Sequence, residues 1–484
     1  MKSYSIRRRR ETFVRHPYRV LARYFRPSEA SRVKNIINRI LTLSEEECRV
    51  LLYSIIEDFE YRHNDVRNVF KKHYLQSQDF IPKQAKLSEE RKLLIGSFFT
   101  REYSIEAAAL FNPSIVPHPD QKGLSSGELR FILSLRATGE GHISSIVFRS
   151  GIIDSKNRLI LDPVRPFVEL PNIEFAPYYP KELFERRLQE LNVDDIIHNL
   201  IFADLPDEFT FEKLNNRLND FKNYRLPSHT LNETISLIDW IAHSNYQLIF
   251  RPKTDISERV IFPVSRLRSN GIEDARFVQF DDDGEMTYFA TYTSFAGHTI
   301  VPMLLETKDF LAFKMRTLNG YAARGKGMAL FPRKINGLYT MVSRQDGENL
   351  FLMQSDDIYL WNETKKLYGP RYKWEFIQVG NCGSPIETEA GWLLLTHGVG
   401  SVREYAIGAI LLDLDDPSKV IGSLKKPLLE PNEVEREGYV PNVVYTCGAL
   451  VHNGMLIMPY ASSDTSSGIA SIRLNELLEM LLDS

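Results

Sequence analysis

Two adjacent carboxylates and an arginine, Glu273, Asp274 and Arg276, stand close together in the chain. They close the segment 269–276, which precedes a run typical of a β-strand at 277–280. A carboxyl group beside a guanidinium can protonate a leaving group or hold sugar hydroxyls. A purely structural Asp–Arg pair at the start of a strand is the alternative, and these residues alone do not decide between the two.

Neighbouring residues of an extended strand point to opposite faces. This geometry predicts that Glu273 and Asp274 do not share a site. One carboxylate is then expected to face a pocket, and the other to bond the backbone or Arg276.

A second group of residues is basic and rich in glycine. The segment 324–337 begins with Arg324 and contains three further lysines and arginines, and Arg344 follows the next predicted strand. Guanidinium groups and the amides of glycine-rich turns suit phosphate or carboxylate. A charged turn at the surface is the alternative.

A third group lies further along the chain. The segment 380–389 combines small residues with a proline, which is typical of a loop that a ligand approaches closely. His397 follows an apolar strand, where a histidine is more often a structural group than a ligand. Asp464, just past another predicted strand, could hydrogen-bond two sugar hydroxyls.

The composition limits the class of protein. With 484 residues, of which 43% are hydrophobic, the chain can bury one large core or two smaller ones. The formal net charge of -3 at pH 7 gives no argument for binding to nucleic acid or to a membrane. The basic run 7–10 is interpreted as a solvated N-terminal arm or a contact between subunits.

The three cysteines, Cys48, Cys382 and Cys447, are widely spaced and form no CxxC pair. This spacing argues against a disulfide framework or a zinc site and for a reducing compartment. No secretory signal, membrane-spanning run, nucleotide fingerprint, G-x-S-x-G or H-E-x-x-H motif is recognised. We therefore expect a cytoplasmic protein without a bound metal.

The chain is expected to change character at about residue 105. Residues 1–105 are predicted to form a helical region, and Ser44 and Glu47 have the spacing of a capping box. Apolar residues at helical spacing predict helices over 28–43, 44–61, 65–75 and from residue 88. Residues 106–484 change to short strands and turns.

One pattern recurs five times after residue 106: a turn with Gly or Asp, an alternating apolar strand, a polar loop and a second strand. The turns begin at 127, 283, 336, 390 and 453. The last four are spaced by about 50 to 65 residues, which suits four-stranded blades. The predicted fold class is therefore mainly β, with a five-bladed β-propeller catalytic domain over 106–484 and a pocket on its axis.

A helical insertion at about 165–255 is expected between the first two blades. Its helices are predicted at 180–191, 193–201, 211–221 and 232–243. Packing or oligomerisation, together with the N-terminal helices, is the expected role of the insertion rather than catalysis.

Several short segments follow one another in the order of a known family: FNP (111–113), LRA (135–137), GIEDAR (271–276), LFPRKING (330–337), EAGWL (389–393), HG (397–398), GAILLDLDDP (408–417) and VPNVV (440–444). With them the chain resembles glycoside hydrolase family 130, the inverting β-mannoside phosphorylases and mannosidases on five-bladed propellers. The resemblance covers roughly residues 106–480, apart from the insertion.

The resemblance implies roles for the first group of candidates. Asp274 would be the general acid, which delivers a proton to the leaving oxygen. The mannosyl unit would be held by Asn112, Arg136 and Asp464.

The resemblance also implies a phosphate site formed by Arg324, Arg344 and His397. Inorganic phosphate would be a co-substrate, and no cofactor is expected. Because phosphate is itself the nucleophile, no protein base is needed, and cations must offset its charge beside the acid. Phosphorolysis of a β-mannoside would then release α-mannose 1-phosphate.

Two alternatives stay open. An inverting β-mannosidase would use water and a carboxylate base, for which Glu387 is the candidate. Gln378, where phosphorylases of the family commonly have a lysine, keeps this alternative open. The third reading is a non-catalytic carbohydrate-binding propeller. The expected partners are a β-mannoside oligosaccharide and phosphate, and self-association through the helical regions is left open.

Overall fold

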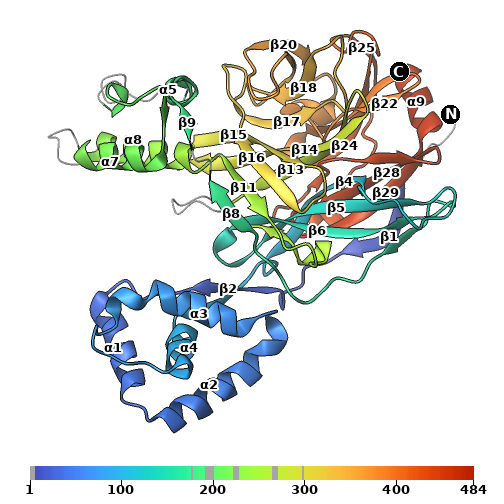
Figure 1. Cartoon of the computed structure of the whole chain (residues 1–484). Coiled ribbons are helices and arrows are strands. Elements are labelled where there is room, and N and C mark those ends of the chain that lie inside the picture. The colour runs from blue at the N-terminus through green and yellow to red at the C-terminus, as the bar shows by residue number, and fades with distance from the viewer. Residues whose placement is uncertain are drawn as a thin grey trace.

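The computed structural model describes residues 6–175, 178–190, 201–221, 228–263, 271–296 and 299–483. Over these residues strands predominate, with one group of helices near the N-terminus and a second in the middle of the sequence (Figure 1). The expectation of a mainly β chain is confirmed. No helix among the described residues has the length and apolar character needed to cross a membrane.

Five antiparallel sheets make up most of the molecule. The first contains, in spatial order, β12 (Val260–Ile261), β6 (Ser144–Ile153), β5 (Leu129–Thr138) and β4 (Ala109–Pro117), with β7 (Leu159–Leu161) beside β6. The second contains β13 (Glu273–Asp282), β14 (Glu285–Ala296), β15 (Thr299–Thr307), β16 (Ala312–Thr317), β11 (Tyr246–Ile249) and β8 (Asn172–Phe175).

The remaining three sheets follow along the chain. The third is β17 (Lys326–Leu330), β18 (Tyr339–Arg344), β19 (Leu350–Ser355) and β20 (Glu363–Tyr368). The fourth is β21 (Gln378–Asn381), β23 (Gly391–Val399), β24 (Tyr405–Leu412) and β25 (Val420–Ser423), with β22 (Ile386–Thr388) beside β23. The fifth is β1 (Arg7–Phe13), β29 (Ser466–Arg473), β28 (Met455–Ser462) and β26 (Val444–Tyr445), with β27 (Leu450–His452) beside β28, and α9 (Leu474–Leu482) follows it.

Each of the five predicted repeats supplies strands to a different one of these sheets. The turns at 127, 283, 336, 390 and 453 immediately precede β5, β14, β18, β23 and β28. The strand pairing among the described residues shows no closed sheet. The arrangement of the five sheets as propeller blades therefore stays a prediction.

The N-terminal helices are α1 (Ala30–Leu41), α2 (Glu45–Phe59), α3 (Val66–Gln76) and α4 (Glu89–Phe98), and the ribbon of β2 (Val20–Tyr24) and β3 (Thr100–Ser104) connects them to the sheets. They lie apart from the sheets, around a core of their own (Figure 1). α2 begins as predicted, because Ser44 Oγ accepts from the Glu47 amide at 3.2 Å and the Ser44 amide donates to Glu47 Oε2 at 2.7 Å.

The basic run 7–10 lies in a strand and is not a solvated arm. β1 pairs antiparallel with β29, and Arg8 donates to the two carboxylate oxygens of Glu435 at 2.9 and 2.7 Å. Phe13, at the end of β1, is buried in an apolar core with Ile457 and Ile469. The interpretation of this run as a solvated arm is wrong, because its backbone pairs with β29 and the side chain of Arg8 is held by Glu435.

The insertion contains α5 (Lys181–Glu190), α7 (Phe211–Phe221) and α8 (Ser228–Ala242), which project to one side of the sheets in Figure 1. The helix expected over 193–201 falls almost entirely outside the described residues. Short strands also occur here, since β8 and β11 extend the second sheet and β9 (Tyr179–Pro180) pairs with β10 (Glu208–Phe209). Trp240 of the insertion shares one apolar core with Phe148 of the first sheet and Phe277 of the second.

A buried ionic group ties the segment before β2 to the first sheet. The Glu106 carboxylate accepts hydrogen bonds from Arg19 and, at 2.9 Å, from Arg149. The side chains of Arg19 and Glu106 are fully buried. Burial lowers the pKa of Arg19 to about 10 against the attraction of Glu106. Removing one member of such a group leaves a buried charge uncompensated.

We therefore expect Glu106→Gln to lower the free energy of unfolding by about 3–5 kcal/mol. Urea unfolding followed by circular dichroism measures this change. Glu46→Gln is the matched control, because its ion pair with Arg49 is exposed, at 73% and 52%, and its loss should cost less than about 1 kcal/mol. Equal losses in the two variants would contradict the expectation.

Candidate active site

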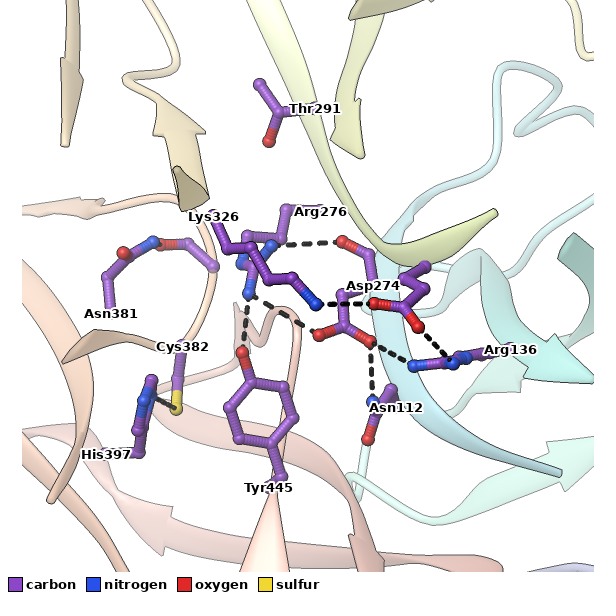
Figure 2. A network of polar contacts seen from close by, with 12 residues as sticks. Asn112, Arg136, Asp274, Arg276, Thr291, Lys326, Asn381, Cys382, His397 and Tyr445 are labelled. Atoms are coloured by element: carbon purple, nitrogen blue, oxygen red, sulfur yellow. Dashed lines mark hydrogen bonds and ion pairs between the residues drawn. The ribbon is translucent and has the colours of Figure 1, made fainter. Parts of the chain in front are cut away.

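Asn112 and Asp274 meet where the first and second sheets approach each other (Figure 2). Their φ angles are +48° and +54°, a left-handed conformation that Asn and Asp adopt more readily than other L residues. Each lies where the register of its strand shifts, in β4 and in β13. As a result Asn112 Nδ2 donates to Asp274 Oδ1 at 2.7 Å.

The same irregularity overturns the prediction that Glu273 and Asp274 point to opposite sides. Arg136 Nη2 donates to Glu273 Oε1 at 2.7 Å, and Arg136 Nη1 lies 3.4 Å from Asp274 Oδ1. The left-handed residue interrupts the alternation of an extended strand, so both carboxylates reach one guanidinium.

Arg276 lies on the other side of Asp274. Its Nη1 donates to the Asp274 carbonyl at 3.1 Å, and its Nη2 donates to the Tyr445 hydroxyl at 2.5 Å. Nη2 is also 4.0 Å from Asp274 Oδ2. Oδ1 of Asp274 thus faces Asn112 and Arg136. Within the part of the chain that the structure describes, Oδ2 of Asp274 has the long contact with Arg276. Oδ2 is therefore the oxygen better placed to exchange a proton with a ligand.

Gly271 allows the two sheets to come close at this point. Its φ is +109°, and a Cβ there would lie 2.4 Å from the amide nitrogen of Ser144. The hydroxyl of Ser144 accepts from Arg136 Nε at 2.9 Å. A side chain at position 271 would therefore displace the residue that orients Arg136. Residues 269–270 of the predicted segment lie outside the described residues.

Asp274 and Asp464 have opposite electrostatic environments. Burial raises the pKa of Asp274, but the guanidiniums of Arg136 and Arg276 outweigh it and hold the pKa below its usual value. Burial and the charge of Asp274 raise the pKa of Asp464, at the turn after β28, to about 7, against the attraction of Arg136. Carboxylates whose pKa values are pushed apart are typical of acid–base chemistry.

Arg344 and His397 contact each other between the third and fourth sheets. Arg344 Nη1 donates to His397 Nε2 at 3.1 Å. When the amide of Gln378 is oriented with its oxygen toward Arg344, that oxygen accepts from the same Nη1 at 2.7 Å. Gln378 therefore holds the guanidinium in place and adds no charge.

His397 is neutral in this environment. Burial and the charges of Arg344 and Arg276 lower its pKa well below the usual value. Its Nδ1 lies 3.7 Å from Cys382 Sγ, so Nδ1 carries the hydrogen while Nε2 accepts from Arg344. The His397 ring needs a glycine at position 380, because a Cβ there would lie 2.3 Å from Cε1 of His397.

Lys326, the first residue of β17, reaches the carboxylate of Glu273. Lys326 Nζ donates to Glu273 Oε2 at 2.9 Å. Gly325, with φ +77°, turns the backbone just before it. Arg324 is exposed and donates to the Tyr321 carbonyl at 2.7 Å. Arg324 therefore lies at the surface of the turn, whereas Lys326 reaches the buried carboxylates.

Glu387 lies away from these residues. Its carboxylate accepts from Arg333 at 2.7 and 2.9 Å, and this pairing lowers its pKa. In β22 it is opposite Trp392, five residues before His397 in β23. Five strand residues span roughly 16 Å. The structure therefore does not bring Glu387 to the site of Asp274, and the predicted alternative base is not supported by its position.

Several buried polar atoms around these residues have no hydrogen-bond partner in the described protein. They include Asn112 Oδ1, Arg276 Nε, Arg344 Nε and Asn381 Oδ1. Buried polar groups of folded proteins are nearly always paired. Their concentration between the sheets is typical of a site for a polar ligand. Among the described residues, no three of His, Cys, Asp and Glu are grouped as metal ligands.

Arg276, Lys326 and Tyr445 belong to the network but were not among the predicted site residues. Arg276 and Lys326 stand in segments that the sequence singles out, and the glycines around Lys326 are a usable signal. The sequence gives no usable signal for Tyr445, because its partner Arg276 is 169 residues away in the chain.

Comparison with known proteins now adds independent evidence. The model of glycoside hydrolase family 130, described as beta-1,4-mannooligosaccharide phosphorylase, matches residues 246–483. The beta-1,2-mannobiose phosphorylase of Listeria innocua is 29% identical over 364 residues, 72% of this chain and 95% of that protein. The 1,2-beta-oligomannan phosphorylase of Thermoanaerobacter sp. is 35% identical over 212 residues, 43% of this chain and 70% of that protein. The chain belongs to glycoside hydrolase family 130.

Membership of family 130 confirms the family predicted from the ordered motifs. The relatives named above are phosphorylases, which are glycosyl-transferring enzymes, and this is the predicted enzyme class. Among solved structures, the Listeria innocua beta-1,2-mannobiose phosphorylase in complex with beta-1,2-mannobiose aligns with 79% of this chain and 94% of its own, at 24% identity and a TM-score of 0.47.

The raised pKa of Asp464 in this family 130 protein has a measurable consequence for stability. With a pKa of about 7 in the folded state, Asp464 binds its proton more tightly than in the unfolded chain. As the pH rises from about 4 to 7, the free energy of unfolding of the wild type should therefore fall relative to that of Asp464→Asn, by on the order of a few kcal/mol. Above pH 7 this difference should not change further.

Urea unfolding of both proteins at several pH values measures the difference. Parallel curves for the wild type and Asp464→Asn from pH 4.5 to 8 would contradict the expectation.

Proposed function

We propose that the protein is an inverting β-mannoside phosphorylase, which cleaves a β-linked mannoside with inorganic phosphate and releases α-mannose 1-phosphate. The names of its family 130 relatives support phosphorolysis of mannosides. The observation that carries the proposal is the place of Asp274 between two groups of polar side chains. Asn112 and Arg136 contact it on one side. On the other side Arg276 donates to the Tyr445 hydroxyl, and the ring of Tyr445 packs against His397 of the second group.

In this proposal the five sheets are blades of a propeller, and the site lies on its axis. One residue from each sheet joins the same connected network: Asn112, Asp274, Lys326, His397 and Tyr445, from the first, second, third, fourth and fifth sheets (Figure 2). Convergence of five sheets on one point is what radial packing about an axis produces.

We assign the mannosyl unit to Asn112, Arg136 and Asp464. The unpaired Oδ1 of Asn112 can accept from a sugar hydroxyl. Asp464, with a pKa of about 7, can donate as well as accept near neutral pH, which suits hydroxyl groups.

Asp274 is assigned as the proton donor, through Oδ2. Its pKa is held low in the ligand-free site, so it must gain a proton when the substrates bind. A phosphate dianion bound nearby adds negative charge, which raises the pKa of a neighbouring carboxyl group. The phosphate oxygen then attacks C1, the bond from C1 to the leaving oxygen breaks, and the proton of Asp274 moves to that oxygen. The proton carried by hydrogen phosphate restores the acid form.

The phosphate is assigned to Arg324, Arg344 and His397. Because His397 is neutral, its Nε2 accepts from Arg344 and orients that guanidinium, and the positive charge comes from the arginines. Arg344 has a buried Nε without a partner in the described protein, which leaves a donor for an anion. The side-chain oxygen of Gln378 accepts a hydrogen bond from this guanidinium and holds it in place.

Phosphorolysis is favoured over hydrolysis by the position of Glu387. A hydrolase that inverts configuration needs a carboxylate base across the sugar from its acid. Glu387 is paired with Arg333 at the far end of β23 instead. Phosphate as nucleophile needs no such base.

The reaction itself tests the proposal. With β-linked mannobioses, we expect formation of α-mannose 1-phosphate that depends on added phosphate, measured by ³¹P and ¹H NMR. Asp274→Asn should lower kcat by about 10²–10⁴-fold, the usual contribution of a general acid, while substrate still binds. Release of free mannose at the same rate with and without phosphate would refute the proposal.

The phosphate assignment has its own test. Arg344→Ala should raise the KM for phosphate at least about tenfold and change the KM for the mannoside much less, because it removes a charged donor from one substrate alone. Arg333→Ala is the matched control, since that arginine pairs with Glu387. Equal effects on both substrates, or equal effects of both variants, would remove Arg344 from the phosphate site.

A further inference from the structure

Two exposed rings from different sheets are stacked next to the candidate active site. The ring of Tyr439, in the loop before β26, lies against that of His142, in the turn between β5 and β6. The ring centroids are 5.6 Å apart, the planes are inclined by 27°, and the Tyr439 hydroxyl is 3.3 Å from His142 Nδ1. Tyr439 is 62% exposed and His142 is also exposed. Both rings of the pair are therefore accessible from solvent.

Both residues of the pair are linked to the site, one through a backbone hydrogen bond and the other through its position in the chain. The Tyr439 amide donates to Thr465 Oγ1 at 3.1 Å, and Thr465 directly follows Asp464. His142 stands two residues before Ser144, whose hydroxyl accepts from Arg136. The stacked pair thus lies beside the residues assigned to the mannosyl unit.

The loops do not depend on this ring pair for their conformation. The turn that carries His142 accepts a hydrogen bond from the Tyr103 hydroxyl, at 3.0 Å to the carbonyl of Glu140. The loop that carries Tyr439 is fixed by the Val440 amide, which donates to the Ser463 carbonyl at 3.1 Å. Large aromatic groups held at the surface by other contacts are typical of recognition surfaces.

Other exposed apolar side chains stand in loops at the same end of the sheets. Each of these loops precedes or follows a strand that has a site residue at or near that end. They hold Tyr321 before β17, Phe376 before β21, Val402 after β23 and Val434 before β26, with exposures of 73%, 65%, 86% and 84%. Loops of four of the five sheets thus present large exposed side chains, if the stacked pair is counted with them.

We propose that Tyr439 and His142 form a platform on which a sugar unit beyond the reacting mannosyl unit stacks, so that the substrate is an oligosaccharide whose chain leaves the pocket over this pair. The proposal rests on the proposed function for the identity of the reacting unit. A pyranose ring has an apolar C–H face, which packs on an aromatic ring, and hydroxyl edges, which remain solvated. A chain that leaves the pocket past Asp464 meets these rings next.

Binding measurements without turnover test the platform. Calorimetric titration with β-linked mannotriose should give a dissociation constant about five- to tenfold higher for Tyr439→Ala combined with His142→Asn than for the wild type. The dissociation constant for methyl β-mannoside, which has no further sugar unit, should not change. Tyr61→Ala removes a tyrosine that is 67% exposed in the N-terminal helical region and is the matched control.

The outcomes separate this proposal from the proposed function. Equal affinity of wild type and double variant for mannotriose would overturn the platform, even if mannose 1-phosphate is formed. Loss of affinity in the double variant without any formation of mannose 1-phosphate by the wild type would uphold the platform and refute phosphorolysis. A dimeric wild type and a monomeric double variant in sedimentation velocity would overturn the platform by making the rings a contact between subunits.

Discussion

The hydrogen bond between Asn112 and Asp274 is the interaction on which the arrangement of the site depends. Both residues have positive φ, which costs on the order of 1–3 kcal/mol each for a non-glycine residue. In regular strands their side chains would follow the alternation of their neighbours and would not meet. The two register shifts turn Asp274 toward Arg136 as well, so one irregularity in each sheet sets the partners of this carboxylate and the direction of its pKa shift. Backbone strain at such positions is typical of functional sites.

Local signals of the sequence predicted what depends on local structure. The spacing of Ser44 and Glu47 predicted the start of α2, and the turn at 336–337 predicted the start of β18, because capping and turn chemistry act over a few residues. The motif around Asp274 pointed to the segment that forms the centre of the site. For the cap and the turn, the decisive contacts lie within the segment itself.

Contacts between distant segments could not be predicted in this way. The pairing of β1 with β29 joins the two ends of the chain, and nothing in the run 7–10 indicates a strand. Glu387 was a reasonable candidate base by residue type, but the salt bridge with Arg333 depends on how the third and fourth sheets pack. The alternation rule failed at Glu273 and Asp274 because the register shifts between Glu273 and Arg276, and Asp274 takes a left-handed conformation that no pattern in the sequence indicates.

The strand pairing of the fifth sheet has a consequence for biosynthesis. β1 leaves the ribosome long before its partner β29, because nearly the whole of the described chain lies between them. Until then the edge of β1 has no partner from its own sheet, and Phe13 lacks the Ile457 and Ile469 side chains around it. Completion of this sheet therefore has to wait for β29, and until then the open edge of β1 needs protection from premature association.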